Sequence, residues 1–363
     1  MGKLRCGFIG GGSIMRVHAK IAAEREDVEM VAVADVAEPV LQAAGDMFNI
    51  PNRYADYKDM VEKEDLDFVV VGVPNAFHYG GTMAALQAGC HVLCEKPPAL
   101  NVGQAKEMAA EAEKQGRRLA FGLHQRFHPE VETGHQYLSS GRLGEVYHAS
   151  VKMFRRRGIP GLGSWFTTKA VAGGGALIDI GVHELDKTHY LMGKPKPIAA
   201  SAVIHARFGS DPDNYNYLSM WGTPVPGGPF DVDDLATALI RFENGASLNV
   251  QVSWAANTPQ GSEMRVLGTK GGLYVGGQYG GLAREGRGEL TILTEDNGFL
   301  ADITPMYNKH DPKTVQMDHF IDRIRHPEKK LRMDGQQGVV LQHMLDAIYA
   351  SAAEGREVKI ELD

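Results

Sequence analysis

Short apolar runs alternate with helical patterns through the first third of the chain, and this alternation constrains the fold more than any other feature. The runs that predict buried strands cover residues 4–9, 28–34, 66–73, 91–94 and 119–123. Helical patterns lie between them, and glycines of the kind that end helices stand at Gly89 and Gly116. Because parallel strands need long crossover connections, usually helices, the alternation predicts a doubly wound parallel sheet.

A glycine-rich turn follows the first predicted strand. The segment from Gly10 to Met15 reads G-G-G-S-I-M, which is the pattern G-x-G-x-x-G with methionine in place of the third glycine. The first glycine, Gly10, permits a tight turn, and the second, Gly12, lets the backbone approach a pyrophosphate at a helix N-terminus. The turn therefore predicts a dinucleotide-binding domain.

An acidic residue, Asp35, directly follows the second predicted strand. It lies about 20 residues beyond the glycine-rich turn, the spacing of a carboxylate that binds a ribose. Such a carboxylate accepts hydrogen bonds from both ribose hydroxyls of adenosine but repels a 2′-phosphate. Val36 and Ala37, which follow, offer no cation to neutralise that phosphate. The pattern favours NAD over NADP, while an acid that merely faces solvent stays an open alternative.

Two more segments end predicted strands of the same sheet. Pro74 and Asn75 follow one strand, His78 opens the next helix, and Glu95 and Lys96 follow another strand. Ligands of open α/β sheets bind outside the carboxyl ends of the strands, so these residues are candidates for a ligand site. The alternatives are a solvated loop for Glu95 and Lys96, and a simple helix-start role for His78.

After residue 124 the pattern changes to strands joined by turns. The predicted strands cover residues 145–154, 198–208, 235–242, 246–254, 264–267, 273–275 and 290–293, and the predicted helices cover 129–140, 315–325 and 336–353. Asn244-Gly245 predicts a hairpin, and hairpins in series indicate a mostly antiparallel sheet. We expect an α/β protein with a Rossmann domain at residues 1–124 and an α+β domain at 125–363, where residues 209–229 form a long loop, a lid or a subunit contact.

A glycine-rich segment in the second half precedes a helix with two polar residues. Asp179 and His183 are four residues apart and share one helical face. Asp179 falls in the first turn, where the helix dipole favours a carboxylate. Apolar neighbours indicate that this face is partly enclosed. An ordinary amphipathic helix with an internal Asp–His contact stays open as the alternative.

Composition and charge argue against several classes of protein, namely nucleic-acid-binding, membrane, secreted and zinc-binding proteins. The formal net charge is -7, which argues against a nucleic-acid or anionic-membrane surface. No apolar run approaches the roughly 18 residues of a membrane span, and the N-terminus lacks the plan of a signal peptide. Cys6, Cys90 and Cys94 are odd in number and lack zinc-binding spacing. We expect a cytoplasmic, reduced protein without a metal site.

The sequence resembles the glucose–fructose oxidoreductase, inositol 2-dehydrogenase and rhizopine-catabolism (Gfo/Idh/MocA) family of NAD(P)-dependent oxidoreductases. The segments that carry the resemblance are GFIGGGSIMRVHA, VPNAFH, AGCHVLCEKP and GGGALIDIGVHELD, in this order over nearly the whole chain. The sequence departs from the family at Met15 and at His124-Gln125-Arg126, where many members carry an Asn-Tyr-Arg-like triplet. The family fold is a Rossmann domain followed by an open antiparallel sheet whose exposed face commonly makes subunit contacts, which implies a homodimer or homotetramer.

The resemblance also implies roles for individual residues. The catalytic group is Lys96, Asp179 and His183. The residues around NAD are Gly10, Gly12, Ser13, Ile14, Asp35, Pro74, Asn75, His78, Glu95, Lys96 and Gln125. The candidate substrate residues are these three catalytic residues, Lys96, Asp179 and His183, together with Arg155 and Trp165, which are proposed from their residue types and not from the resemblance. For Trp165 core packing is an equal alternative to stacking on a sugar, and for Arg155 a solvated role is an equal alternative to binding substrate.

These residue types suit the oxidation of a secondary alcohol. His183 is the expected base near neutral pH, Lys96 the cation that holds the developing alkoxide, and Asp179 the residue that orients them. The roles of Lys96 and His183 can be exchanged. We expect a sugar, glycoside or cyclic polyol as substrate. The alternatives are an NAD-recycling enzyme that cleaves glycosides, a sugar sensor without catalysis, and a metal site made of Asp179, His183 and His124.

Overall fold

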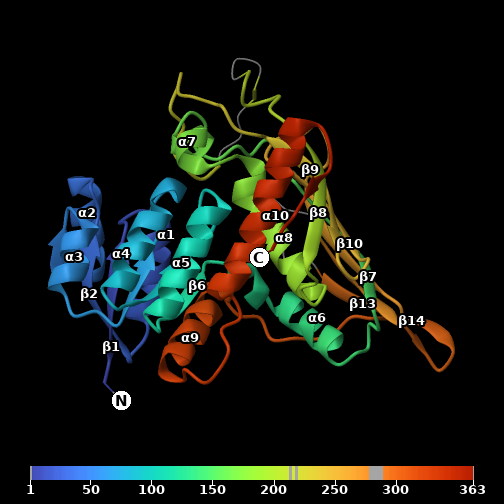
Figure 1. Ribbon diagram of the computed structural model, residues 1–363, viewed down its shortest axis with the longest axis horizontal. Coiled ribbons are helices and arrows are strands. Elements are labelled where there is room, and N and C mark those ends of the chain that lie inside the picture. Colours follow the sequence, from blue (N-terminus) through green and yellow to red (C-terminus); the bar gives the residue numbers. More distant parts are fainter. Residues whose placement is uncertain (1, 212–214, 217–219, 278–288, 363) are drawn as a thin grey trace. The chain divides into compact units, whose positions relative to one another are not determined.

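The computed structural model describes residues 2–211, 215–216, 220–277 and 289–362 (Figure 1). The chain forms two compact units, Met1–His124 with Asp311–Gln342 and Gln125–His310 with His343–Asp363. The predicted domain division at residue 124 stays a prediction. The compact units differ from it because a late segment, Asp311–Gln342, packs with the first 124 residues.

A parallel sheet forms the centre of the first unit. Its strands are β1 (Leu4–Ile9), β2 (Val28–Ala34), β3 (Asn52–Tyr54), β4 (Phe68–Val71), β5 (His91–Cys94) and β6 (Leu119–Phe121). The order is β3-β2-β1-β4-β5-β6, and each neighbouring pair runs parallel. This is the Rossmann order, so the predicted doubly wound sheet is confirmed. The sequence does not predict β3, because its half-buried residues form no apolar run.

Helices connect these strands and bury their apolar faces against the sheet. They are α1 (Ser13–Ala23), α2 (Glu38–Phe48), α3 (Tyr57–Lys63), α4 (His78–Gln87), α5 (Val102–Lys114) and α9 (Pro312–Arg325). A short turn of 3-10 helix, Asn75–Phe77, precedes α4. Helix α4 begins at His78, as predicted, and the Asn101 side chain caps α5 by accepting a hydrogen bond from the Gln104 N–H at 3.0 Å.

Helix α9 comes from the far end of the chain and completes the first unit. The Phe320 ring meets Phe68 of β4 edge to face, with 5.9 Å between centroids, and the Gln316 amide donates to the Phe121 carbonyl of β6 at 3.0 Å. These contacts explain why α9 belongs to this unit although more than 180 residues separate it from β6. Long-range packing of this kind leaves no local pattern in the sequence.

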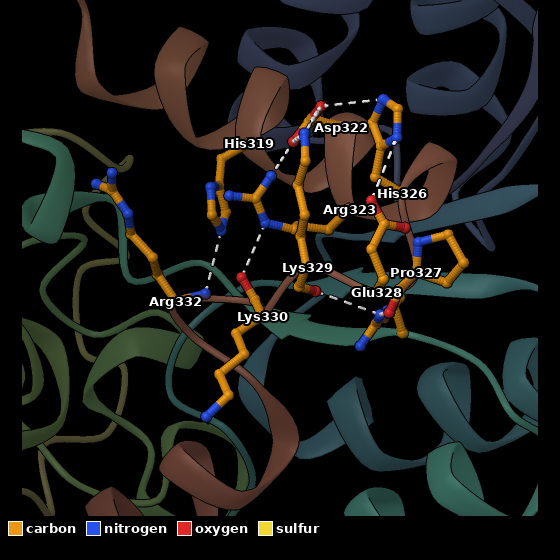
Figure 2. A network of polar contacts seen from close by, with 10 residues as sticks. His319, Asp322, Arg323, His326, Pro327, Glu328, Lys329, Lys330 and Arg332 are labelled. Atoms are coloured by element: carbon orange, nitrogen blue, oxygen red, sulfur yellow. Dashed lines mark hydrogen bonds and ion pairs between the residues drawn. The ribbon is translucent and has the colours of Figure 1, made fainter.

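A polar network holds the segment that follows α9 (Figure 2). Arg323 donates through Nε to the Lys330 carbonyl at 2.8 Å, and His319 Nε2 accepts from the Arg332 N–H at 3.1 Å. Burial, followed by the charges of Arg323 and Arg332, lowers the pKa of His319 to about 3, which suits a ring nitrogen that accepts. The network fixes residues 326–332 against the end of the helix.

A mixed sheet forms the second unit. Its strands are β7 (Val146–Phe154), β8 (Pro197–His205), β9 (Leu235–Phe242), β10 (Ser247–Ser253), β11 (Gly261–Gly268), β12 (Gly271–Gly277), β13 (Glu289–Asp296), β14 (Phe299–Ile303) and β15 (Val358–Lys359). The order is β14-β13-β12-β11-β7-β10-β9-β8-β15. Among the described strands, β7 and β10 run parallel and the other neighbours are antiparallel, which confirms the predicted open, mostly antiparallel sheet.

The hairpin predicted at Asn244-Gly245 joins β9 to β10, and Gly245 has a φ of 83°. Strands β14 and β15 were not predicted. Of the predicted loop at 209–229, residues 212–214 and 217–219 lie outside the described part of the chain.

The helices of the second unit include the one that carries Asp179 and His183. They are α6 (Pro129–Ser139), α7 (Lys169–Ala172), α8 (Val182–Leu191) and the end of α10 (Gly335–Glu354). Two turns of 3-10 helix cover His124–Phe127 and Trp165–Thr167, and a π-helical turn, Leu177–Gly181, leads into α8.

A buried ion pair joins the start of this unit to α8. Arg126 donates to both carboxylate oxygens of Asp186, through Nε at 2.8 Å and through Nη2 at 2.5 Å. Both side chains are only 2% exposed. The guanidinium also lies 5.1 Å from the centre of the Tyr190 ring. This bidentate ion pair fixes the position of α8, because a buried charge without its partner is unfavourable and the two side chains must therefore stay together.

We predict that Asp186→Ala destabilises the protein by about 3–5 kcal/mol, because it leaves the Arg126 guanidinium buried without its partner. Urea unfolding followed by circular dichroism measures the change. The matched control is Glu357→Ala, which removes the carboxylate of an exposed pair with Arg241 and should leave the unfolding midpoint nearly unchanged. Equal midpoint shifts for the two variants would contradict the role given to the buried pair.

Candidate active site

The backbone of the glycine-rich turn after β1 is suited to bind an anion. Gly10 has a φ of 102°, and a Cβ there would lie 2.7 Å from the Gly72 carbonyl oxygen, so only glycine fits. A Cβ on Gly12 would meet nothing within 4 Å, which shows open space beside the turn. Helix α1 starts at Ser13, and no side chain caps it. The first N–H groups of α1 can therefore bind a pyrophosphate.

Asp35 stands beside this turn at the end of β2. Its Oδ2 accepts from the Gly11 N–H at 2.7 Å, and its Oδ1 accepts from the Ala37 N–H at 2.8 Å. These bonds fix a half-buried carboxylate next to the glycines. Val36, the next residue, is 90% exposed and brings no positive charge. The arrangement suits the two hydroxyls of a ribose and disfavours a phosphate.

His78 ties together the segments that follow β4 and β5. Its Nδ1 lies 2.8 Å from the Pro97 carbonyl oxygen, and its Nε2 lies 3.0 Å from that of Val73. Burial lowers the pKa of His78, although the hydrogen bond to the Pro97 carbonyl raises it. The ring thus fixes two loops at the carboxyl edge of the sheet. Asn75 is buried in the turn before α4, and Pro74 precedes it.

Glu95 and Lys96 follow β5, and the Glu95 side chain turns inward. The carboxylate is 6% exposed, and its Oε1 lies 2.7 Å from His18 Nε2. Its Oε2 accepts from the backbone N–H of Lys96 at 3.2 Å. Burial opposes ionisation, but the hydrogen bond from His18 and the charge of Lys313 hold the pKa of Glu95 well below its ordinary range. Lys96 itself is half-buried.

In the second unit, Asp179 is fixed by two partners far away in the sequence. Its Oδ2 accepts from the Trp254 indole N–H at 2.9 Å and lies 3.5 Å from Arg155 Nη1. Asp179 is 8% exposed and Trp254 is fully buried. His183, 5% exposed, follows one turn later in α8. Asp179 lies in a π-helical turn rather than in the predicted regular helix, and such turns are frequent at functional sites.

A second buried carboxylate, Asp233, holds the start of this helical segment. It accepts from the Gly175 N–H at 2.8 Å, the Leu177 N–H at 2.9 Å and the Tyr349 hydroxyl at 2.7 Å. A Cβ on Gly174 would lie 2.0 Å from the Tyr349 hydroxyl, and one on Gly175 would lie 1.8 Å from the Asp233 carbonyl oxygen. The glycines before Asp179 are therefore required by close packing.

The remaining predicted residues lie in mixed surroundings. Trp165 stacks on Phe166 with 3.7 Å between ring centroids, and Phe166 meets Trp221 edge to face at 4.3 Å. Trp221 is 44% exposed, so these aromatic rings are not fully packed into the core. Gln125 is buried in the short turn that opens the second unit. The roles of Trp165 and Gln125 stay predictions.

Other features limit what the chain can bind. Among the described residues, no group of three or more His, Cys, Asp or Glu side chains is placed to hold a metal ion. The three cysteines are buried free thiols. Burial raises the pKa of Cys94 to about 12 and that of Cys90 to about 11. No helix in the described ranges is long and apolar enough to cross a membrane.

Comparisons with known proteins match both halves of the chain. A model described as an oxidoreductase family with an NAD-binding Rossmann fold matches residues 4–123, and the GFO/IDH/MocA C-terminal domain matches residues 131–274. The chain belongs to the Gfo/Idh/MocA oxidoreductase family. D-glucoside 3-dehydrogenase of Escherichia coli is 33% identical over 361 residues, which cover 98% of this chain and 97% of that protein.

Solved structures of similar proteins give the same fold. An aldose-aldose oxidoreductase from Caulobacter crescentus, solved with glycerol, has a TM-score of 0.79 and 27% identity, and the match covers 98% of this chain and 99% of that one. GenD2 from gentamicin A biosynthesis, solved with NAD, has a TM-score of 0.79 and 26% identity over 100% of this chain and 97% of that one.

The first domain of this Gfo/Idh/MocA member is an NAD-binding Rossmann domain. The residues after β1 and β2 fit the cofactor, because the open space at Gly12 and the uncapped α1 accept a pyrophosphate and Asp35 accepts ribose hydroxyls. The distant pairings of three supporting residues were not predicted from the sequence. His18, Asp233 and Trp254 each act on a residue more than 50 positions away.

We predict that Asp35→Ser weakens NAD binding by on the order of 10- to 100-fold, because hydrogen bonds to a charged acceptor are lost. Binding of NADP should improve relative to NAD, since the repulsive carboxylate is gone. Titration of each dinucleotide by fluorescence or calorimetry measures both constants. The control is Asp56→Ser at the N-cap of α3, where serine is also a good cap. Tighter binding of NADP than NAD by the unmodified protein would refute the assignment.

Proposed function

We propose that this protein is an NAD-dependent dehydrogenase that oxidises a secondary alcohol of a sugar, glycoside or cyclic polyol. One observation carries the proposal. The chain aligns over 98% of its length with D-glucoside 3-dehydrogenase and has a Lys96 beside the cofactor edge of its Rossmann sheet, together with a fixed Asp179 one turn before His183. The proposed catalytic residues are Lys96, Asp179 and His183.

His183 is proposed as the base that accepts the hydroxyl proton. Its neutral imidazole accepts a proton near neutral pH, and its low exposure of 5% limits competition by water. NAD held by the first domain would supply the hydride acceptor. The alcohol would then lose its O–H proton to His183 and its C–H hydride to the nicotinamide, and become a ketone. The proton passes from His183 to solvent after the reaction.

Lys96 is proposed to stabilise negative charge on the substrate oxygen as the proton leaves. A cation on a fixed loop is well suited to this role, because it needs little reorganisation as the charge develops. Its backbone is anchored by the Glu95 carboxylate at 3.2 Å. Should His183 instead hold the alkoxide, Lys96 would be the base. The pH experiment below separates these assignments.

Asp179 and Arg155 are proposed to orient the substrate. Trp254 donates to Asp179 at 2.9 Å, which fixes one carboxylate oxygen. Arg155 makes long contacts of 3.4 Å to the Gly158 carbonyl and 3.5 Å to Asp179, and its buried Nε has no hydrogen-bond partner among the described residues. An N–H group that is buried and unpaired favours a substrate oxygen as its partner. Since Asp179 balances the Arg155 charge, the pair suits a neutral polyhydroxy compound.

Trp165 is proposed to stack on a sugar ring. Its partial exposure and its place in an aromatic cluster with Phe166 and Trp221 support this role. We also propose assembly into a homodimer or homotetramer, because the resemblance implies subunit contacts through the open sheet. A cytoplasmic location is proposed as well, because the three cysteines are free thiols.

The function is tested by screening sugars, glycosides and polyols for NADH formation, with NAD and NADP in parallel. We predict that a glucoside or related sugar yields NADH and that Lys96→Ala lowers the turnover number by on the order of 100- to 1000-fold while NAD still binds. Lys63→Ala, which removes an exposed lysine of α3, is the control. Release of an aglycone without net NADH would favour an NAD-recycling glycoside-cleaving enzyme instead. Full activity of Lys96→Ala would exclude its catalytic role.

We predict that oxidative kcat/KM rises about tenfold per pH unit through the range in which an ordinary histidine titrates, near 6.5, and then levels off. The sign follows because a base must be deprotonated before it can accept a proton. His183→Asn should remove this rise and lower the plateau, whereas His205→Asn, at an exposed position of β8, should retain the profile. An unchanged profile in His183→Asn would show that His183 is not the base and would assign that role to Lys96.

A further inference from the structure

A buried pair inside the first unit is not part of the proposed chemistry. His18 lies in the middle of α1, and Glu95 lies 77 residues later, directly after β5. The two side chains are 0% and 6% exposed, and 2.7 Å separates His18 Nε2 from Glu95 Oε1. A polar pair this deep inside a domain is unfavourable unless its hydrogen bonds are well made.

The surroundings of His18 identify which nitrogen carries the proton. Within the described part of the chain, its buried Nδ1 has no hydrogen-bond partner. An N–H group there would be buried and unsatisfied, which is costly, whereas a bare nitrogen costs less. Nε2 is therefore the nitrogen whose N–H donates a hydrogen bond to the Glu95 carboxylate, and His18 acts as a fixed donor.

The remaining surroundings of Glu95 complete its fixation. Helix α9 brings Lys313, whose Nζ lies 3.3 Å from Nδ1 of His124, and the positive charge of Lys313 favours the ionised carboxylate. The carboxylate also needs the absence of a side chain at Gly122, because a Cβ there would lie 2.6 Å from Oε2. Helix α1, the end of β6 and helix α9 therefore all help to fix one carboxylate.

The fixed carboxylate acts on the backbone of Lys96. Two backbone hydrogen bonds mark the end of strand β5. The Glu95 N–H donates to the Val71 carbonyl at 2.9 Å, and the Cys94 carbonyl accepts from the Gly122 N–H at 2.7 Å. The next N–H along the chain, that of Lys96, donates to the Glu95 carboxylate at 3.2 Å. The Glu95 carboxylate thus accepts the first backbone N–H after the last hydrogen bonds of the sheet. The lysine is then anchored at its own backbone, at the base of its flexible side chain.

We propose that His18 and Glu95 are positioning residues, which fix the backbone of Lys96 so that its ammonium group meets the reacting oxygen. This inference rests on the proposed function, in which Lys96 acts on the substrate. It gives Glu95 a role other than contact with NAD. It also assigns a role to His18, which lies in the second turn of α1 within the segment GFIGGGSIMRVHA.

The test compares two substitutions of His18. His18→Gln keeps an amide N–H donor near the position of Nε2, whereas His18→Met fills the space without a donor. We expect His18→Met to lower kcat by on the order of 10- to 100-fold, since a displacement of about 1 Å of a catalytic group has an effect of this size. The dissociation constant of NAD should stay within about threefold, because the glycine turn and Asp35 are unchanged. His18→Gln should restore most of kcat.

A double-mutant cycle shows whether the effect passes through Lys96. In a Lys96→Ala background, where no ammonium group remains to be positioned, His18→Met should cause no further loss of kcat. A loss as large as in the unmodified background, or no loss of kcat in either, would overturn the inference. Failure of the proposed function is read separately, from full activity of Lys96→Ala alone.

A readout independent of turnover guards against a variant that is merely unstable. Amide hydrogen exchange in the peptide that contains Lys96 should become faster in His18→Met and return to the original rate in His18→Gln. Exchange in the peptide of β11, which belongs to the second unit, serves as the control and should be unchanged in both variants. Unchanged exchange at Lys96 in His18→Met would contradict the positioning role.

Discussion

The parallel hydrogen-bond ladder of the first unit is the constraint on which the candidate site depends. Parallel strands in the order β3-β2-β1-β4-β5-β6 end at a common edge, so the segments after β1, β2, β4 and β5 meet there although they are separated in sequence. The glycine turn, Asp35, Asn75 and Lys96 owe their places to this geometry. Contacts beyond the ladder then fix each segment, as His78 does for the loops after β4 and β5.

Buried carboxylates give the second unit its fixed polar groups. Asp179, Asp186 and Asp233 are each at most 8% exposed, and each receives hydrogen bonds from groups distant in sequence. A buried carboxylate without such donors would be strongly unfavourable, so the donors must be ordered wherever the acid is. This requirement explains the fully buried Trp254 and the close approach of Tyr349 to the glycines before Asp179. Asp179 is therefore held in place because its buried carboxylate requires ordered hydrogen-bond donors.

Features with a local pattern were predictable from the sequence, and features with distant partners were not. The glycine turn, the start of helix α4 at His78 and the hairpin at Asn244-Gly245 each depend on neighbouring residues, and each is found as expected. Helix α9 was expected as a helix, but its membership of the first unit depends on Phe320 and Gln316 contacting strands formed far earlier in the chain.

The candidate site divides in the same way. Lys96, Asp179 and His183 stand in recognisable motifs that indicate their roles. His18 lies within the segment GFIGGGSIMRVHA, but nothing in that segment indicates a partner at Glu95, and Trp254 is an ordinary strand-end aromatic. Their importance appears only when the fold brings them within 2.7 Å of Glu95 and 2.9 Å of Asp179. The π-helical turn at Asp179 is likewise invisible in the sequence, because its residues are equally compatible with a regular helix.

Transfer of a labelled hydride tests the central claim most directly, which is that a secondary alcohol carbon gives its hydride to NAD. The protein is incubated with NAD and a glucoside that carries deuterium on its ring carbons, and both products are analysed by mass spectrometry. The account predicts that a keto sugar forms and that NADH gains one deuterium for each ketone. Consumption of the glucoside without deuterium in NADH, or ketone formation without NADH, would contradict it.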